Sequence, residues 1–336
     1  MPKVSVILLS FNNSQYIRES IQSILSQTYR DFELIIGDDA STDNSLEICR
    51  SFSDLRIKLL TSDKNLGIVD NIDRCLNATS GEFVGIMGSD DMMLPANIER
   101  KVRFLEENPY LGFVHSNHYL MDESGEMIGW HFSEYPPADT IFKGLDVFRR
   151  LIFEENVINI NTVMLPRNIF SKVGGYDRQF PTAHDYEFCA RVALQLDIGY
   201  IAEPLFKYRY HPASVTQKTQ DTPQKAVRKR VEVQQCKVAA FENYFKLPDK
   251  KIFTPDELRH LLGHIGWYYL HINELHFARR AFQMAVCHGT FSIKNILRYL
   301  ATFLPLSTIK KIKSFKHELS RRKPWNTLPI SSQSHS

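Results

Sequence analysis

Residues 4–39 read VSVILLSFNNSQYIRESIQSILSQTYRDFELIIGDD, and they decide the fold. The stretch opens with a continuous apolar run, VSVILLSF, and closes with a second, FELIIGDD; such runs are typical of buried strands. Asn12 or Asn13 could cap a helix between them. Its apolar residues recur at helical spacing: Ile17, Ile21, Ile24 and Leu25. A strand, a helix and a strand in this order predict one unit of a parallel sheet.

The same alternation continues to residue 91. A helix from Thr42 or Asp43 is followed by a strand at IKLL, a helix through Leu76 and a strand, EFVGIM, that runs into GSDD. Further along, NINTVML at residues 159–165 is expected to form another strand, closed by Pro166. We therefore expect an α/β fold with a Rossmann-like, mostly parallel sheet. In such sheets ligands collect at the carboxyl ends of the strands. Two acidic pairs occupy such ends: Asp38 with Asp39, and Asp90 with Asp91.

Paired carboxylates at neighbouring strand ends repel one another unless a cation or hydrogen-bond donors stabilise them. Mg²⁺ is held in proteins by one or two carboxylates together with substrate phosphates. A divalent cation would also stabilise the diphosphate that leaves when a sugar is transferred from a nucleotide sugar. The plainer interpretation is that the acids cap turns and helices. No phosphate-binding glycine motif of the P-loop or dinucleotide type follows a strand, which argues against those two classes.

The chain resembles the bacterial family 2 inverting glycosyltransferases. The resemblance covers roughly residues 3–216, with the family's motifs in their usual order and spacing. VSVILLSFNN and FELIIGDDASTDNS match the opening signature, and NLGIVDNIDRCLNATSGEFVGIMGSDDMMLP continues through the metal-binding loop. HDYEFCARVA and YRYHPAS complete it. The resemblance implies a glycosyltransferase A fold.

The resemblance also implies roles for particular residues. Matches to the nucleotide-binding positions are Ser10, Phe11, Asp38, Asp39, Asn65 and Asp90. Matches to the positions that hold Mn²⁺ or Mg²⁺ are Asp90, Asp91 and His211. Asp185 matches the general base that deprotonates the acceptor hydroxyl, so that a single in-line displacement inverts the anomeric carbon. Arg209 is open to two interpretations, a bidentate phosphate contact and an ordinary salt bridge.

The function implied by the resemblance is sugar transfer from a nucleotide sugar, expected to be UDP-linked. The transferred group would be a hexosyl or N-acetylhexosaminyl group, and the acceptor a glycan or lipid-linked hydroxyl in bacterial surface polysaccharide synthesis. Two positions depart from the family pattern: Gly88 and His184 stand where many members have an acid. Gly88 keeps an alternative open, a non-catalytic nucleotide-sugar-binding or scaffolding protein.

The composition is that of an ordinary folded protein, with 43% hydrophobic and 24% charged residues. Five scattered cysteines without a C-x-x-C pair indicate a reducing compartment and neither a disulfide framework nor a zinc site. The first apolar run is too short for a signal peptide, and no run reaches the ~20 apolar residues of a spanning helix. We therefore expect a cytoplasmic protein.

A polar stretch, residues 212–224, marks the expected domain boundary. It separates a catalytic domain, residues 1–216, from a helical C-terminal region, residues 217–330. Within that region, residues 256–287 contain two helical patterns that separate near Asn273. The predicted architecture is thus an α/β domain with an α-helical C-terminal extension.

A basic amphipathic tail begins at about residue 291. From there the chain has nine Lys/Arg and one acid, a net charge of +8 that leaves about −5 for residues 1–290. Basic amphipathic helices bind anionic membrane surfaces, and packing on the protein with a solvated basic face is the alternative; both stay open. Membrane contact would place the chain at the inner face of the cell membrane. No nucleic-acid-binding motif accompanies the charge, so nucleic acid is not an expected partner.

Overall fold

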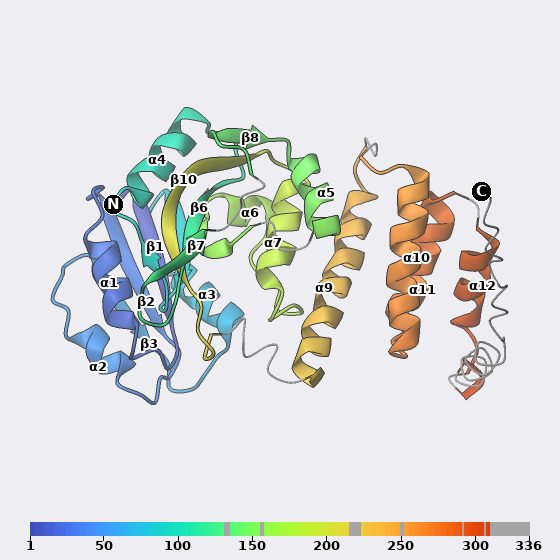
Figure 1. Ribbon diagram of the computed structural model, residues 1–336, viewed down its shortest axis with the longest axis horizontal. Helices are drawn as coiled ribbons and strands as arrows, with labels where there is room; N and C mark the ends of the chain where they lie inside the picture. Colours follow the sequence, from blue (N-terminus) through green and yellow to red (C-terminus); the bar gives the residue numbers. More distant parts are fainter. Residues whose placement is uncertain are drawn as a thin grey trace, which may run out of the picture. The chain divides into compact units, whose positions relative to one another are not determined.

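The computed structural model describes residues 1–130, 135–154, 158–214, 223–248, 252–290, 292–305 and 307–309. The chain divides into two compact units, Met1–Ile252 and Phe253–Ser336. Figure 1 shows that the first unit holds the sheet with its flanking helices, and that the second is built from helices. The parts of the tail from residue 310 onward lie outside the described residues.

Among the described residues, the sheet of the first unit has ten strands: β1 (Val4–Ser10), β2 (Phe32–Asp38), β3 (Ile57–Thr61), β4 (Phe83–Gly88), β5 (Met92–Met93), β6 (Phe113–Met121), β7 (Met127–Trp130), β8 (Thr140–Phe142), β9 (Met164–Pro166) and β10 (Ile198–Arg209). Their order is β3-β2-β1-β4-β9-β6-β10-β5, with β7 paired to β6 and β8 to β10. The long strands pair in parallel, β1 with β2 and β4, and β6 with β10. The predicted α/β fold with a mostly parallel sheet is confirmed.

One predicted strand, residues 159–165, differs from the structure. Its first half forms a short 3₁₀ helix, Ile160–Thr162, and only its end joins the sheet as β9. The chain turns here because the Asn159 side chain accepts a hydrogen bond from the Asn161 backbone N–H. β9 then runs antiparallel to both β4 and β6 and joins the two parallel parts of the sheet.

The helices of the first unit are α1 (Ile17–Leu25), α2 (Ser45–Arg50), α3 (Ile68–Leu76), α4 (Asn97–Glu107), α5 (Gly144–Glu154), α6 (Ile169–Val173), α7 (His184–Ala193) and α9 (Pro223–Tyr244). The central strand β1 is buried along nearly its whole length, as expected for a parallel strand covered on both faces. On one face Val6 and Leu8 share a core cluster with Ile21 of α1. On the other, α3 packs so closely that a Cβ atom on Gly37 would overlap Cys75 Sγ.

The boundary between the units lies later than the sequence led us to expect. The first unit ends at Ile252 rather than at residue 216, and α9 belongs to it. The Glu232 carboxylate of α9 accepts hydrogen bonds from the backbone N–H (2.8 Å) and hydroxyl (2.6 Å) of Thr182, in the loop before α7. Because α9 contributes to holding α7 in place, the polar stretch before it connects parts of one unit.

The second unit contains α10 (Pro255–His271), α11 (Leu275–His288) and α12 (Ile293–Ala301). α10 begins with a capping box between Thr254 and Glu257 and a proline in its first turn. Asn273 adopts a positive φ of 65° between α10 and α11. The predicted pair of helices separating near Asn273 is therefore confirmed.

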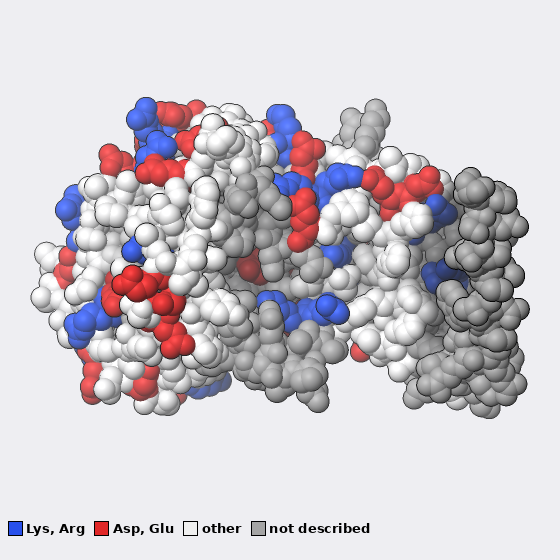
Figure 2. All heavy atoms as spheres, in the orientation of Figure 1, with Lys and Arg blue, Asp and Glu red and all other residues white. Residues whose placement is uncertain are grey.

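The surface of the described chain carries both signs of charge. Figure 2 shows basic and acidic side chains mixed over the visible face of the first unit. Within the described ranges, no helix is both long enough and apolar enough to cross a bilayer.

Candidate functional site

The carboxyl ends of three parallel strands lie level with one another. Ser10 at the end of β1 is in register with Asp38 at the end of β2, and Leu9 is in register with Gly88 at the end of β4. The loops that follow these strands carry the acids singled out from the sequence. The register therefore brings both acidic pairs to one edge of the sheet, as the strand-end argument predicted.

Asp38 closes the turn after β2. Its carboxylate accepts hydrogen bonds from the Ser41 backbone N–H (3.0 Å) and hydroxyl (2.6 Å), and the Ser10 hydroxyl lies 3.4 Å away. The side chain is buried. The turn-capping role, which was the plainer interpretation of this acid, is the one that its own contacts display.

Asp39 holds the loop that contains Asn65. Its two carboxylate oxygens accept hydrogen bonds from the backbone N–H groups of Leu66 (2.8 Å) and Gly67 (3.0 Å). Asn65 Oδ1 accepts from the same Gly67 N–H at 3.1 Å. Gly67 has a φ of +85°, a conformation that glycine adopts without strain. Asp39 and Asn65 thus lie together, although 26 residues separate them in the sequence.

The loop after β1 is rigidly held but exposes Phe11. Asn12 has a positive φ of 52° and accepts a hydrogen bond from the Thr42 backbone N–H. The Asn13 side chain donates to the Ser89 hydroxyl at 2.9 Å. These asparagines do not cap α1, contrary to the expectation from the sequence, because α1 begins only at Ile17 and their side chains reach the neighbouring loops instead. Phe11 remains 46% exposed at the sheet edge.

Asp90 and His211 are in direct contact. Asp90 Oδ2 lies 3.0 Å from His211 Nε2, and the histidine is buried while the carboxylate is 20% exposed. The His211 ring packs edge-on against Tyr16, with 4.7 Å between the ring centroids. The end of β4 and the segment after β10 therefore meet here, 121 residues apart in the sequence.

Asp91 is buried and fully hydrogen-bonded. Oδ1 accepts from the Arg209 backbone N–H and Oδ2 from the Asn161 side chain, each at 2.8 Å. Burial and the neighbouring charge of Asp90 raise the pKa of Asp91 well above its usual range, whereas the two donors oppose that rise. Among the residues that the structure describes, no three His, Cys, Asp or Glu side chains converge to hold a metal ion.

Arg209 organises the loops around this pair. Its buried guanidinium donates to the carbonyl oxygens of Asp90 (2.8 Å) and Glu123 (3.0 Å) and to the Glu19 carboxylate (2.6 Å). It also lies over the Tyr16 ring, 4.6 Å from its centroid. Of the two interpretations of Arg209, the structure shows the salt bridge: the guanidinium donates to two backbone carbonyl oxygens and one carboxylate of the chain itself.

Gly88 allows Asp90 to fold back over the end of β4. A Cβ atom at position 88 would lie 2.7 Å from Asp90 Oδ1, closer than real Cβ atoms come to an oxygen. The Gly88 backbone N–H donates to Asn161 Oδ1 at 3.3 Å. Gly88 therefore leaves room for the Asp90 carboxylate, which lies close to where a side chain at position 88 would begin.

Asp185 lies in the first turn of α7, where a carboxylate is favoured by the helix dipole. Its Oδ1 accepts from the Tyr186 backbone N–H at 2.8 Å. No other residue of the described chain donates a hydrogen bond to its second oxygen. The loop before α7 is tied to α3, because Arg178 forms ion pairs with Asp70 and Asp73. α3 follows the Asn65 loop directly, which links α7 to the nucleotide-site candidates.

Two residues of this arrangement were not among the site residues expected from the sequence. Asn161 bridges Gly88 and Asp91, and Glu19 neutralises Arg209. Asn161 was assigned to a strand, where its side chain would have had no special role. The signal that could have exposed it is the run of three asparagines at 156, 159 and 161, which is unusual within an apolar strand.

Comparisons with known proteins agree on the class. A family model described as Glycosyl transferase family 2 matches residues 5–153. A Methanocaldococcus jannaschii protein described as an uncharacterized glycosyltransferase is 30% identical over 213 residues, 62% of this chain and 71% of that protein. An Escherichia coli enzyme, the UDP-Glc:alpha-D-GlcNAc-diphosphoundecaprenol beta-1,3-glucosyltransferase WfgD, is 34% identical over 121 residues, 36% of this chain and 47% of the enzyme.

Solved structures share the fold of this chain. Residues 1–349 of S. aureus TarS, crystallised with UDP, superpose with a TM-score of 0.63 over 94% of this chain and 92% of that one, at 14% identity. The sheet and its flanking helices form the glycosyltransferase A fold. The chain belongs to glycosyl transferase family 2.

Proposed function

We propose that the chain is an inverting glycosyltransferase that moves a hexosyl or N-acetylhexosaminyl group from a nucleotide sugar to an acceptor hydroxyl. The observation that carries the proposal is the contact between Asp90 and His211 at the sheet edge where the strand-end loops converge. In a family 2 chain, that edge is where a nucleotide diphosphate would be held. Asp185 on α7 supplies the second requirement, a base, since its second oxygen accepts no hydrogen bond from the residues that the structure describes.

The proposed donor is UDP-linked. The E. coli relative is named for UDP-Glc, and the S. aureus structure contains UDP. In this chain the exposed ring of Phe11 can stack on a base, beside the buried hydroxyl of Ser10. Asp38, Asp39 and the Asn65 loop that Asp39 holds would complete the nucleotide pocket.

The proposed acceptor is a glycan or lipid-linked hydroxyl in bacterial surface polysaccharide synthesis. The E. coli relative is named for an acceptor whose sugar is linked through a diphosphate to the lipid undecaprenol. A lipid-linked acceptor would be reached at the inner face of the membrane, which agrees with the basic tail from about residue 291. The tail is accordingly the proposed membrane contact.

Asp90 and His211 fit Mn²⁺ or Mg²⁺. A carboxylate oxygen and an imidazole nitrogen already lie 3.0 Å apart, and the carboxylate is partly exposed, so that substrate phosphates could complete the ligand set. When bound, the cation would stabilise the charge that develops on the leaving diphosphate. The two oxygens of Asp91 accept hydrogen bonds from Arg209 and Asn161, so Asp91 would hold the loop in place. To bind the metal as well, Asp91 would have to give up one of these two hydrogen bonds.

Asp185 is the proposed general base. The helix dipole favours its ionised form, and its second oxygen can accept the proton of an acceptor hydroxyl as that oxygen attacks the anomeric carbon. Glu232 and Thr182 position it, since they tie the loop before α7 to α9. Attack opposite the leaving diphosphate in one step inverts the anomeric centre.

A second candidate function is nucleotide-sugar binding without turnover. Gly88 favours it, because one carboxylate of the usual metal loop is missing. The two functions separate in one assay. The purified chain, incubated with a panel of UDP-sugars and Mn²⁺, should release UDP by slow hydrolysis, and chelation with EDTA should abolish the release until Mn²⁺ or Mg²⁺ is added back. Tight UDP-sugar binding with no UDP release under any metal condition would favour the binding protein.

Substituting Gly88 tests the proposed metal site. Gly88→Ala places a Cβ 2.7 Å from Asp90 Oδ1, so the carboxylate must shift, and we expect its contact with His211 to be disturbed. We expect roughly tenfold weaker Mn²⁺-dependent UDP binding by calorimetry, as for loss of a supporting contact at a metal site, with the melting temperature little changed. Gly129→Ala on β7 is the matched control, because a Cβ there meets nothing within 4 Å. Unchanged Mn²⁺ dependence in Gly88→Ala would exclude Asp90 as a ligand.

A further inference from the structure

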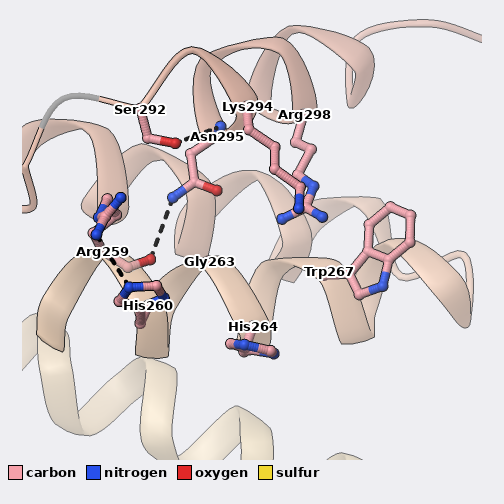
Figure 3. Close-up of a pocket in the computed structure, with 9 residues that line it drawn as sticks. All are labelled: Arg259, His260, Gly263, His264, Trp267, Ser292, Lys294, Asn295 and Arg298. Carbon is pink, nitrogen blue, oxygen red and sulfur yellow. Dashed lines mark hydrogen bonds between the residues drawn. The ribbon is translucent and has the colours of Figure 1, made fainter. Parts of the chain in front are cut away.

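The second unit contains a pocket of its own. It has a volume of about 370 Å³ and lies between α10 and the start of α12 (Figure 3). Its charged, aromatic and imidazole lining consists of Arg259, His260, His264, Trp267, Lys294 and Arg298. All of these residues lie within Phe253–Ser336 and outside the proposed catalytic site.

The described lining of the pocket is cationic and includes no acid. Arg259 is partly neutralised by Asp256, whose carboxylate lies 3.0 Å away. Lys294 and Arg298 have no ion-pair partner among the described residues, and both extend from α12 toward α10 (Figure 3). Such a concentration of positive charge attracts an anion.

The Arg298 guanidinium is held in place by an aromatic ring. It lies over the Trp267 ring, 4.5 Å from the centroid, which fixes the side chain in the pocket. Burial lowers the pKa of Arg298, because the side chain has lost part of its contact with water. The group nevertheless stays charged, since arginine does not lose its proton in proteins. A phosphate could accept two of its N–H bonds.

The pocket has a defined shape, because α12 is fastened to α10 at its base. Asn295 is buried, and its Nδ2 donates to the Arg259 carbonyl oxygen at 3.2 Å. A Cβ atom on Gly263 would lie 2.9 Å from that Nδ2, so glycine is what lets the two helices approach. Ser292 caps α12 by accepting from the Asn295 backbone N–H. The cations therefore project from a fixed frame.

The outer face of α12 is apolar. Ile293, Leu297 and Leu300 are 63%, 60% and 55% exposed, and they recur at helical spacing. At about 100° per residue, Asn295 points to the side opposite this row, and Lys294 and Arg298 fall roughly a quarter to a third of a turn from it. The helix thus presents an apolar stripe with cations beside it, the pattern of helices that lie in a membrane interface.

We propose that the pocket between α10 and α12 binds the phosphate of an anionic membrane lipid, whose acyl chains lie along the apolar row of α12. The cations match the phosphate, and the adjoining row matches the hydrocarbon that is attached to it. The proposal rests on the membrane contact in the proposed function, and it assigns the specific part of that contact to the folded α10–α12 pair. The lipid site does not depend on how the donor and the acceptor bind in the first unit.

Vesicle sedimentation tests the site in the full-length chain. The vesicles contain phosphatidylglycerol and phosphatidylcholine, or phosphatidylcholine alone. We expect Lys294→Gln with Arg298→Gln to weaken partitioning onto the anionic vesicles about thirtyfold. Lys310→Gln with Lys311→Gln removes the same charge from the tail and should weaken it clearly less. Equal losses in the two double variants would overturn the pocket, since diffuse attraction alone would then account for both.

A second variant tests the lipid as the source of the phosphate. Leu297→Ser with Leu300→Ser changes only exposed positions of α12, so the fold should persist by circular dichroism while vesicle binding falls. Titration of inorganic phosphate, followed by tryptophan fluorescence with the Trp267→Phe variant as the blank, gives the soluble arm. Phosphate binding in the micromolar range together with undiminished vesicle binding of the leucine variant would overturn the lipid assignment. Wild-type chain that sediments with neither vesicle refutes the membrane contact itself, whereas UDP release from UDP-sugars decides the transferase independently.

Discussion

Asp185→Asn should abolish sugar transfer while leaving the donor bound. The substitution keeps the shape of the side chain and its acceptance of the Tyr186 N–H, but it removes the group that would take the acceptor proton. Loss of a general base lowers kcat by about 10²- to 10⁴-fold. UDP affinity, measured by calorimetry with Mn²⁺, should stay within about twofold, because the carboxylate is not among the proposed nucleotide contacts.

Asp146→Asn is the matched control for that experiment. Asp146 occupies the first turn of α5, as Asp185 does in α7, so the two substitutions remove the same helix-dipole interaction. We expect the Asp146 variant to retain full turnover. If Asp185→Asn also retained it, the base would have to be sought elsewhere; if both variants lost it, helix stability and not proton transfer would be responsible.

Arg209→Met should cost the first unit about 3 kcal/mol of unfolding free energy. The side chain is buried, and its loss leaves the carbonyl oxygens of Asp90 and Glu123 without their donor. Removing one partner from a buried polar cluster is among the few substitutions with effects of this size. Urea unfolding followed by circular dichroism measures the loss. Mn²⁺-dependent UDP binding should weaken with it, because Arg209 fixes the backbone of Asp90.

The control for Arg209 is Arg103→Met. Arg103 pairs with Glu107 along the exposed side of α4, at 2.9 Å, and the pair is open to solvent. Exposed pairs of this kind contribute little to stability, so its unfolding midpoint should match the wild type. An Arg209 variant as stable as the Arg103 variant would mean that water replaces the lost donors and that the network is not structural.

The sheet edge could be predicted because local patterns encode it. Apolar runs of strand length, helical spacing between them and acids directly after them sufficed to bring Asp38, Asp39, Asp90 and Asp91 together. The right-handed βαβ rule then left few alternatives for the order of the strands. The structure confirmed the fold in this half of the first unit.

The contacts of those acids could not be predicted. Asp91 is paired with the backbone of Arg209, 118 positions away, and with Asn161, 70 positions away. No local pattern encodes such partners, and the assignment of Asn161 to a strand concealed it. The same holds for Gly88, which the sequence presents only as a missing acid, whereas in the structure it makes room for Asp90.

The first compact unit runs beyond the expected domain boundary for a physical reason. The polar stretch before α9 has the composition of a linker, so we expected the first domain to end there. α9 nevertheless packs against α7, and its buried residues reach the first unit: Cys236 Sγ donates to the Ala183 carbonyl oxygen just before α7, and Phe241 contacts Phe148 of α5. The unit to which a long helix belongs depends on the surface that its apolar side covers. For α9 that surface is formed by residues far away in the sequence, so the sequence pattern did not reveal it.

A chimaera of two relatives would have to be joined after α9 and not before it. The Glu232 side chain anchors the loop that carries Asp185 into position, so a graft made at residue 216 would pair the α7 of one parent with the α9 of the other. Such a hybrid could keep its sheet and the proposed nucleotide pocket and still lose the alignment of Asp185, the proposed base.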